Sequence, residues 1–126
     1  MPSYAELKTN MLDQEAFDWF KGVMEVIETL DADAYAALMR EDVELRMPDG
    51  SYLRGPAEVA RVLGEQFSQV ASLEHQDISL YGAMHHAVHE ARVVTTLKEG
   101  TTTVSYQTGW VDADEDGWIT SARVYA

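Results

Sequence analysis

The sequence predicts an α+β fold, with helices from the first half of the chain packed on one face of a curved antiparallel sheet from the second half. Apolar residues recur at three- and four-residue steps over roughly the first 70 residues, a spacing typical of amphipathic helices. From about residue 78 onward they alternate with polar residues, as in strands. At 126 residues we expect one domain, residues 1–126, with a polar lead over residues 1–12.

Three helix signals occur in the first half of the chain. Asp13 can cap the first helix, because its side chain can accept hydrogen bonds from the free N–H groups of a first turn. Asp31 or Asp33 can cap a short second helix that ends near Arg40. The Gly-Pro pair at 55–56 opens a third helix, since proline suits the first helical position. The first helix is expected to bury Phe17, Phe20, Val23, Met24, Ile27 and Leu30, and to leave Asp18, Lys21, Glu25 and Glu28 outside.

The strand signals begin between the second and third helices. Residues 43–47 alternate as a short strand does, and Pro48-Asp49-Gly50 then turn the chain. Lys98-Glu99-Gly100 are expected to form a hairpin turn between two longer strands. The later strands are expected over residues 78–81, 85–97, 101–111 and 118–125.

Composition excludes several classes of protein. The 22 Asp and Glu against 9 Lys and Arg give a formal net charge of -13 at pH 7, which repels nucleic-acid phosphates and anionic membranes. Cysteine is absent, which excludes disulfides and thiolate chemistry and fits a reducing cytoplasm. The start shows no signal-peptide pattern, and no apolar stretch has membrane-spanning length. We therefore expect a cytoplasmic protein with no nucleic-acid or membrane partner.

Four segments match a known superfamily in their order and spacing. They are Asp-Ala-Asp with Tyr-Ala-Ala-Leu-Met at 31–39, Glu-Asp-Val-Glu-Leu at 41–45, Arg-Gly-Pro-Ala-Glu-Val at 54–59 and Asp-Gly-Trp-Ile at 116–119. With them the chain resembles the nuclear transport factor 2-like superfamily, which includes SnoaL-type cyclases and ketosteroid isomerases. The resemblance implies a cone-shaped half-barrel that holds a small, largely apolar molecule, and it often implies a dimer. We expect no cofactor.

The catalytic residues of the superfamily do not carry over to this chain. In a gapless match the isomerase tyrosine falls at Val23, the general-base aspartate at Met47, and the proton-donating aspartate of the oxyanion hole at Gly109. The Arg-x-Asp pattern of the epoxide hydrolases falls on Glu90 and Arg92, with the charge order reversed. The superfamily also includes dehydratases and non-catalytic binding modules, so the fold alone does not define the function.

Glu90 and Arg92 are the leading candidates for the polar end of the pocket. They lie two residues apart on one strand, hence on one face and about 7 Å apart. The gapless match turns this face into the cone, where Glu90 would act as general base, Arg92 would hold an oxyanion, and Gln107 and His86 would add polar contacts. The alternative is a salt bridge on a wetted sheet face or in an inert pocket wall. The opposite face is more apolar, and its pattern alone would turn it inward, but we keep the family register.

Asp49 lies beside the expected pocket mouth and would substitute for the lost general base. Its alternative role is that of a turn residue bonded to its own backbone. Six further side chains are expected to line an apolar cavity, although such residues at helical spacing are also typical of plain core. They are Trp19, Phe20, Met24, Tyr35, Met47 and Phe67.

Two stretches resemble metal sites, but neither has the right geometry. His85 and His89 lie about 13 Å apart on a strand with His86 pointing away, so one zinc ion cannot bind all three. Residues 112–117 copy the first half of a calcium loop, yet Arg123 stands where a bidentate glutamate is needed. We expect an acidic hairpin turn there, and no metal.

The outer sheet face is expected to carry Tyr106, Trp110 and His89. An exposed aromatic face in a small acidic protein suggests a homodimer. The sequence therefore indicates a small-molecule-binding protein that catalyses isomerisation, cyclisation, dehydration or hydrolysis on an apolar or amphipathic substrate. The alternatives are a non-catalytic ligand carrier or association module, and a dimerisation protein whose pocket is filled by its own side chains.

Overall fold

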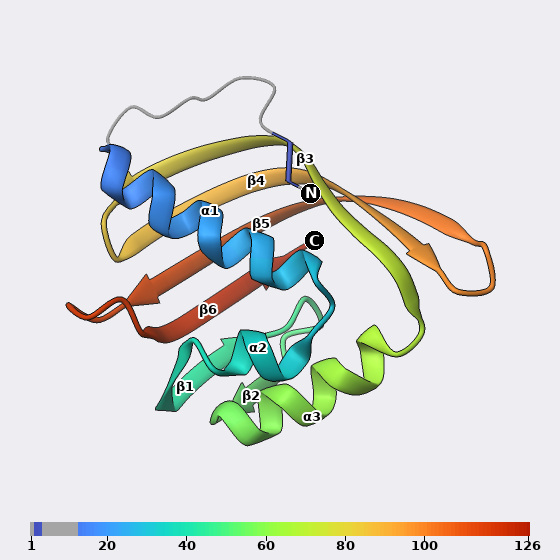
Figure 1. The fold of residues 1–126 in the computed structure, drawn as a ribbon, viewed down its shortest axis with the longest axis horizontal. Coiled ribbons are helices and arrows are strands. Elements are labelled where there is room, and N and C mark those ends of the chain that lie inside the picture. The colour runs from blue at the N-terminus through green and yellow to red at the C-terminus, as the bar shows by residue number, and fades with distance from the viewer. Residues whose placement is uncertain (1, 4–12) are drawn as a thin grey trace.

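The computed structural model describes residues 2–3 and 13–126, so nearly all of the expected polar lead over residues 1–12 lies outside the described residues. In the described part, three helices and six strands form the fold that Figure 1 shows, with helices lying against one face of a curved sheet. The α+β class predicted from the sequence is confirmed. None of the helices in this part combines the length and the apolar character needed to cross a bilayer.

The helices begin where the sequence predicts them. They are α1 (Gln14–Glu28), α2 (Ala32–Ala36) and α3 (Pro56–Phe67). Asp13 caps α1 by accepting a hydrogen bond from the backbone N–H of Ala16 at 2.8 Å, and Asp31 caps α2 in the same way. The second helix does not reach Arg40, because the chain already enters the first strand at Met39.

Within the described residues the strands form one sheet in the order β2-β1-β6-β5-β4-β3. Neighbours run antiparallel except β1 and β6, which pair in parallel and correct the prediction of a wholly antiparallel sheet. The cause is the meander from β3 to β6, whose last strand runs in the same direction as β1 when it reaches it. The strands are β1 (Met39–Arg46), β2 (Tyr52–Arg54), β3 (Val70–Ala83), β4 (His86–Leu97), β5 (Thr102–Ala113) and β6 (Ile119–Tyr125).

A bulge in β3 helps to bend the sheet around the helices. The pairing of β3 with β4 shifts register between Gln76 and Ser79, and Asp77 inside the shift has a left-handed backbone with φ of 53°. An extra residue in one strand bends that strand and increases its twist. The sheet therefore has a concave face toward the helices and a convex face away from them (Figure 1).

The burial pattern of β4 shows which of its residues face the helices. Ala87, Ala91 and Val93 are buried, whereas Glu90 between them is exposed. Since side chains alternate across a strand, the odd-numbered residues of β4 lie on the concave face and the even-numbered residues on the convex face. The expected orientation, with Glu90 turned into the cone, is therefore wrong.

Candidate functional site

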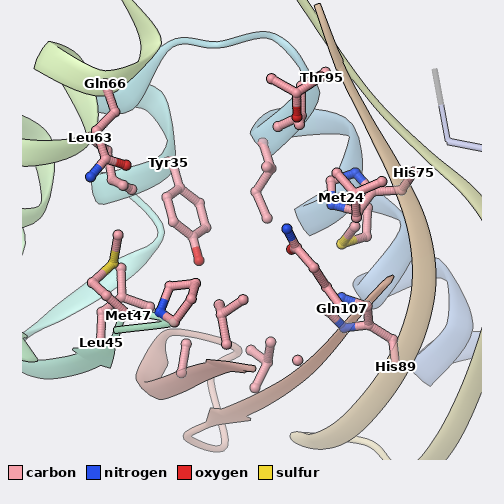
Figure 2. A pocket seen from close by; sticks show the side chains of 18 of the residues that line it. Met24, Tyr35, Leu45, Met47, Leu63, Gln66, His75, His89, Thr95 and Gln107 are labelled. Carbon is pink, nitrogen blue, oxygen red and sulfur yellow. The ribbon is translucent and has the colours of Figure 1, made fainter. Parts of the chain in front are cut away.

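A cavity of about 280 Å³ lies between the helices and the concave face of the sheet. Most of its wall is apolar, and side chains from all three helices and from several strands contribute to it. The structure places five of the expected pocket residues on this wall, and Figure 2 shows four of them as labelled sticks. The five are Met24, Tyr35, Met47, Phe67 and Gln107.

His75 is a polar residue of the wall, and it is paired with a buried carboxylate. Glu28, in the last turn of α1, accepts a hydrogen bond on Oε2 from the backbone N–H of His75 in β3 at 2.6 Å. The same oxygen lies 3.0 Å from the ring Nδ1 of His75. The two side chains are 4% and 7% exposed, so the carboxylate is held almost entirely by protein groups. Glu28 was expected outside the helix bundle, and that expectation is wrong.

The protonation of His75 follows from this contact. Burial lowers the pKa of His75, and the hydrogen bond and charge of Glu28 oppose that shift. A neutral His75 donates a hydrogen bond from its Nδ1–H to the carboxylate, which leaves the lone pair on Nε2. Because His75 lines the cavity and no described residue makes a hydrogen bond to its Nε2, this lone pair is available to a ligand.

His89 in β4 is the second histidine of the cavity wall. Its ring lies edge-on to His75, with 6.3 Å between ring centroids, and packs on Phe20 of α1 at 5.2 Å. Burial, with a smaller effect from His75, lowers the pKa of His89 to about 4. His89 is 8% exposed, so the expectation that it lies on the outer sheet face is wrong.

Acid is expected to destabilise the protein through His89. The unfolded chain binds a proton near pH 6.5 and the folded chain only near pH 4, so the free energy of unfolding falls as pH drops through this window. The loss attributable to His89 is about 3 kcal/mol in total. Urea denaturation at a series of pH values measures it as the difference between the wild type and His89→Phe. Parallel pH curves for the two proteins would contradict the prediction.

Tyr35 and Gln107 bring two further polar groups to the cavity, and Figure 2 shows both pointing toward its middle. Burial raises the pKa of Tyr35 to about 12, so its phenol keeps its proton. The hydroxyl makes no hydrogen bond to any residue that the structure describes. Gln107 donates from Nε2 to Ser105 Oγ at 3.0 Å, which leaves its carbonyl oxygen for a ligand.

Three of the predicted site residues lie on the convex face instead. Glu90 is exposed there, and Arg92 beside it donates from Nη1 to the side-chain oxygen of Gln76. His86 is 72% exposed and its Nδ1 lies 3.0 Å from Asp112. The chemistry assigned to Glu90 and Arg92 depended on their facing the cavity, so it is given up.

Three other candidates also lie away from the cavity wall. Asp49 accepts hydrogen bonds from the backbone N–H and hydroxyl of Ser51, which hold the pKa of its carboxyl below its usual range. This is the alternative role of a turn residue. Trp19 donates from its indole to the carbonyl oxygen of Gly117 at 3.3 Å, and Phe20 is fully buried behind His89.

An arginine side chain forms ion pairs with the acidic turn between β5 and β6. Arg40 bonds Asp114 through Nε and Asp116 through Nη2, the latter at 3.4 Å. The turn is thus an acidic hairpin turn closed by an arginine. Across the described residues, no three His, Asp or Glu side chains are placed to hold one metal ion.

The described part of the chain has the fold of solved structures described as ketosteroid isomerase-like and NTF2-like. The chain belongs to the SnoaL-like domain family, whose model matches residues 20–122. No curated protein matches the sequence.

Solved structures share the fold at low sequence identity. A candidate polyketide cyclase from Xanthomonas campestris pv. campestris is 22% identical with a TM-score of 0.78, over 90% of each chain. An LEH-like epoxide hydrolase from M. tuberculosis is 20% identical with a TM-score of 0.72, over 88% of this chain and 81% of that one. A computationally designed 17-OHP binder is 17% identical with a TM-score of 0.71, over 90% of this chain and 92% of that one. At these identities the likeness shows the fold alone.

Proposed function

We propose that the protein binds a small, largely apolar or amphipathic molecule in the cavity and catalyses proton transfer on it without a cofactor. Proton transfer of this kind is the chemistry of an isomerase, a cyclase or a dehydratase. A hydrolase would also need charged groups that activate a nucleophile. One observation carries the proposal: His75 lines a mostly apolar cavity and is paired with the buried carboxylate of Glu28. A base paired with a buried carboxylate is the arrangement that abstracts protons in many enzymes.

His75 is the general base of this proposal. Its Nε2 takes a proton from a ligand carbon, and Glu28 stabilises the imidazolium that forms. Such a base can remove a C–H proton beside a carbonyl when a donor stabilises the enolate oxygen that forms. Burial of both side chains strengthens the attraction between Glu28 and the imidazolium, because solvent screens it little. The candidate polyketide cyclase among the similar structures supports a carbonyl-bearing ligand.

Exchange of the α-hydrogens of cyclohexanone for deuterium in D₂O tests this function. The probe is a small apolar ring with one carbonyl, and NMR measures the exchange rate directly. We expect the protein to accelerate exchange above the buffer rate, and the variant His86→Gln to do so equally, because His86 is exposed on the convex face. Binding of the ketone without exchange would overturn the catalytic proposal.

A non-catalytic ligand carrier is the second candidate function. The mostly apolar wall favours it, and a computationally designed 17-OHP binder is built on the same fold. The exchange experiment separates the two functions, since a carrier binds cyclohexanone and leaves its α-hydrogens in place.

We also propose that two copies associate through the convex face, with no nucleic-acid or membrane partner and in the cytoplasm. Large aromatic side chains are exposed along this face, and Tyr106 is 75% and Trp110 41% exposed. Tyr81 lies in the same cross-strand row as Trp110, with Val88 between them. Covering such a patch is what an interface between two copies achieves.

Charge placed on the convex face is expected to dissociate this dimer. Tyr106→Glu introduces a carboxylate into the centre of the contact, and sedimentation velocity is expected to show a shift from dimer to monomer. Trp118→Glu is the control, because Trp118 is an exposed aromatic residue like Tyr106 but lies in the turn between β5 and β6. A wild-type protein that sediments as a monomer would remove the proposal.

A further inference from the structure

The two nitrogens of the His89 ring have different surroundings. Nδ1 is buried and has no hydrogen-bond partner among the residues that the structure describes. Because Nδ1 is buried and His89 lines the cavity, Nε2 is the ring nitrogen that a ligand can reach. A ring nitrogen that is buried without an acceptor is a poor place for a proton, since an N–H group loses its hydrogen bond to water there.

Gly109 in β5 fixes the position of this ring. It lies directly opposite His89 in the pairing of β4 with β5. A Cβ atom at residue 109 would lie 2.2 Å from Cε1 of His89 and 2.9 Å from each ring nitrogen. The imidazole therefore fills the space that any other residue at 109 would take with its own side chain. Phe20 closes the other side of the ring.

The environment of His75 is the opposite one. Its Nδ1 has a carboxylate acceptor in Glu28, so the Nδ1–H form is stabilised and Nε2 carries the lone pair. His89 has no acceptor for an Nδ1 proton, so its Nε2 carries the proton. Both rings are neutral, and on adjacent strands they present one acceptor and one donor to the same cavity.

We infer that His89 is held as the neutral Nε2–H form and donates a hydrogen bond to an oxygen of the ligand, while His75 accepts a proton from it. This inference rests on the proposed function and narrows it to ligands that carry a carbonyl oxygen beside an acidic C–H. Tyr35 is a second donor aimed into the same space (Figure 2). A ligand with no acceptor oxygen leaves the His89 N–H unpaired and binds more weakly.

The reaction step balances with these groups alone. His75 Nε2 takes the proton from the carbon next to the carbonyl, and the electron pair of that C–H bond moves to the oxygen. The Nε2–H of His89 stabilises the enolate oxygen and keeps its own proton, as a neutral imidazole does in triosephosphate isomerase. The proton on His75 then returns to the same carbon or to a conjugated one. The product is the exchanged or isomerised carbonyl compound, and both histidines regain their starting forms.

NMR of the ¹⁵N-labelled wild-type protein at neutral pH tests the assignment without any ligand. We expect Nε2 of His89 at the shift of a protonated ring nitrogen and Nδ1 at that of an unprotonated one, with the reverse for His75. A His89 ring protonated on Nδ1 overturns the inference. So does the finding of the same form in both histidines.

Two probes of equal shape test the donor role. Cyclohexanone has a carbonyl oxygen where methylenecyclohexane has a CH₂ group. We expect both to shift the methyl signal of Met24 on the cavity wall, and only the ketone to shift the Nε2–H of His89. Ketone binding that leaves this signal unmoved overturns the inference. Failure of both compounds to bind counts against the proposed function for such ligands, while the ring assignment in the free protein still decides the inference.

His89→Phe removes the donor and keeps a ring against Phe20. We expect it to slow α-hydrogen exchange by about 10²-fold, the typical effect of losing one donor to a developing oxyanion. The Nδ1–H form of His75 and its contact with Glu28 should remain in this variant, which shows that the cavity is intact. An unchanged exchange rate overturns the inference.

Discussion

Replacing His75 by glutamine is expected to slow exchange of the α-hydrogens of cyclohexanone by about 10²–10⁴-fold. Glutamine is polar and of similar size, but it cannot take up a proton near neutral pH. Glu28→Gln should also slow exchange, because a neutral amide stabilises the imidazolium less than a carboxylate does. Exchange rates per mole of folded protein, measured by NMR, test both variants.

His86→Gln is the matched control for this experiment, since it removes a histidine that is 72% exposed on the convex face. Circular dichroism of each variant establishes that the fold is intact. A folded His75→Gln protein that retains the wild-type rate would show that the base is another group.

The pH profile of the exchange reaction provides a further check on His75. The base works when its ring is neutral, and burial lowers the pKa of His75 below its ordinary 6.5. The decline in rate with falling pH should therefore have its midpoint below pH 6.5. A decline that is centred above pH 6.5 would contradict a buried histidine base.

Truncating Phe20 to alanine is expected to lower the free energy of unfolding by about 3–5 kcal/mol, as the loss of a fully buried aromatic ring does. Phe20 is 0% exposed and packs between Met24 and His89 in the core beneath α1. Its removal leaves a void that the neighbouring strands cannot close, because β4 is paired on both sides and holds β3 beside it. Urea denaturation followed by circular dichroism measures the change.

Tyr52→Ala is the matched control for the truncation, since Tyr52 is 43% exposed on β2 at the sheet edge. We expect a change of about 1 kcal/mol or less there. A similar loss in both variants would contradict the view that the packing beneath α1 supports the ring of His89.

Local sequence patterns predicted most of the fold. Asp13 and Asp31 marked the starts of α1 and α2, and the glycine and proline at 55–56 marked the start of α3. These signals involve groups within one helical turn of each other, so they do not depend on the rest of the molecule. The parallel pairing of β1 with β6 joins the two halves of the chain, and no local signal contains it.

The orientation of β4 shows why the site was harder to predict than the fold. A slip of one residue reverses every side chain of a strand, and a gapless match to a superfamily is blind to single-residue bulges such as the one at Asp77. The apolar pattern of Ala87, Ala91 and Val93 indicated the face of β4 that is turned toward the helices. The prediction followed the gapless match to the superfamily instead. His89 lies on the same face, so this pattern could also have predicted that His89 faces the cavity.

Glu28 had a signal in the sequence as well. It follows Met24 by four residues, and Met24 follows Phe20 by four, so all three lie on one line of α1. A carboxylate on a buried line of a helix requires a buried partner. The partner, His75, lies on β3, which follows the third helix in the sequence. The residues next to Glu28 and His75 in the sequence give no sign that the two side chains pair.

The amino-acid order by itself determined the helix starts, most of the strand segments, the mixed architecture and the family of this protein, because these depend on spacing and on contacts between near neighbours. The short strand β2 and the first half of β3 were not predicted. Only the tertiary structure decided which side chains meet at the cavity. Glu28, His75, His89 and Gly109 come from four different elements. Their contact depends on the bend of the sheet and the register of its strands, which the whole chain sets together.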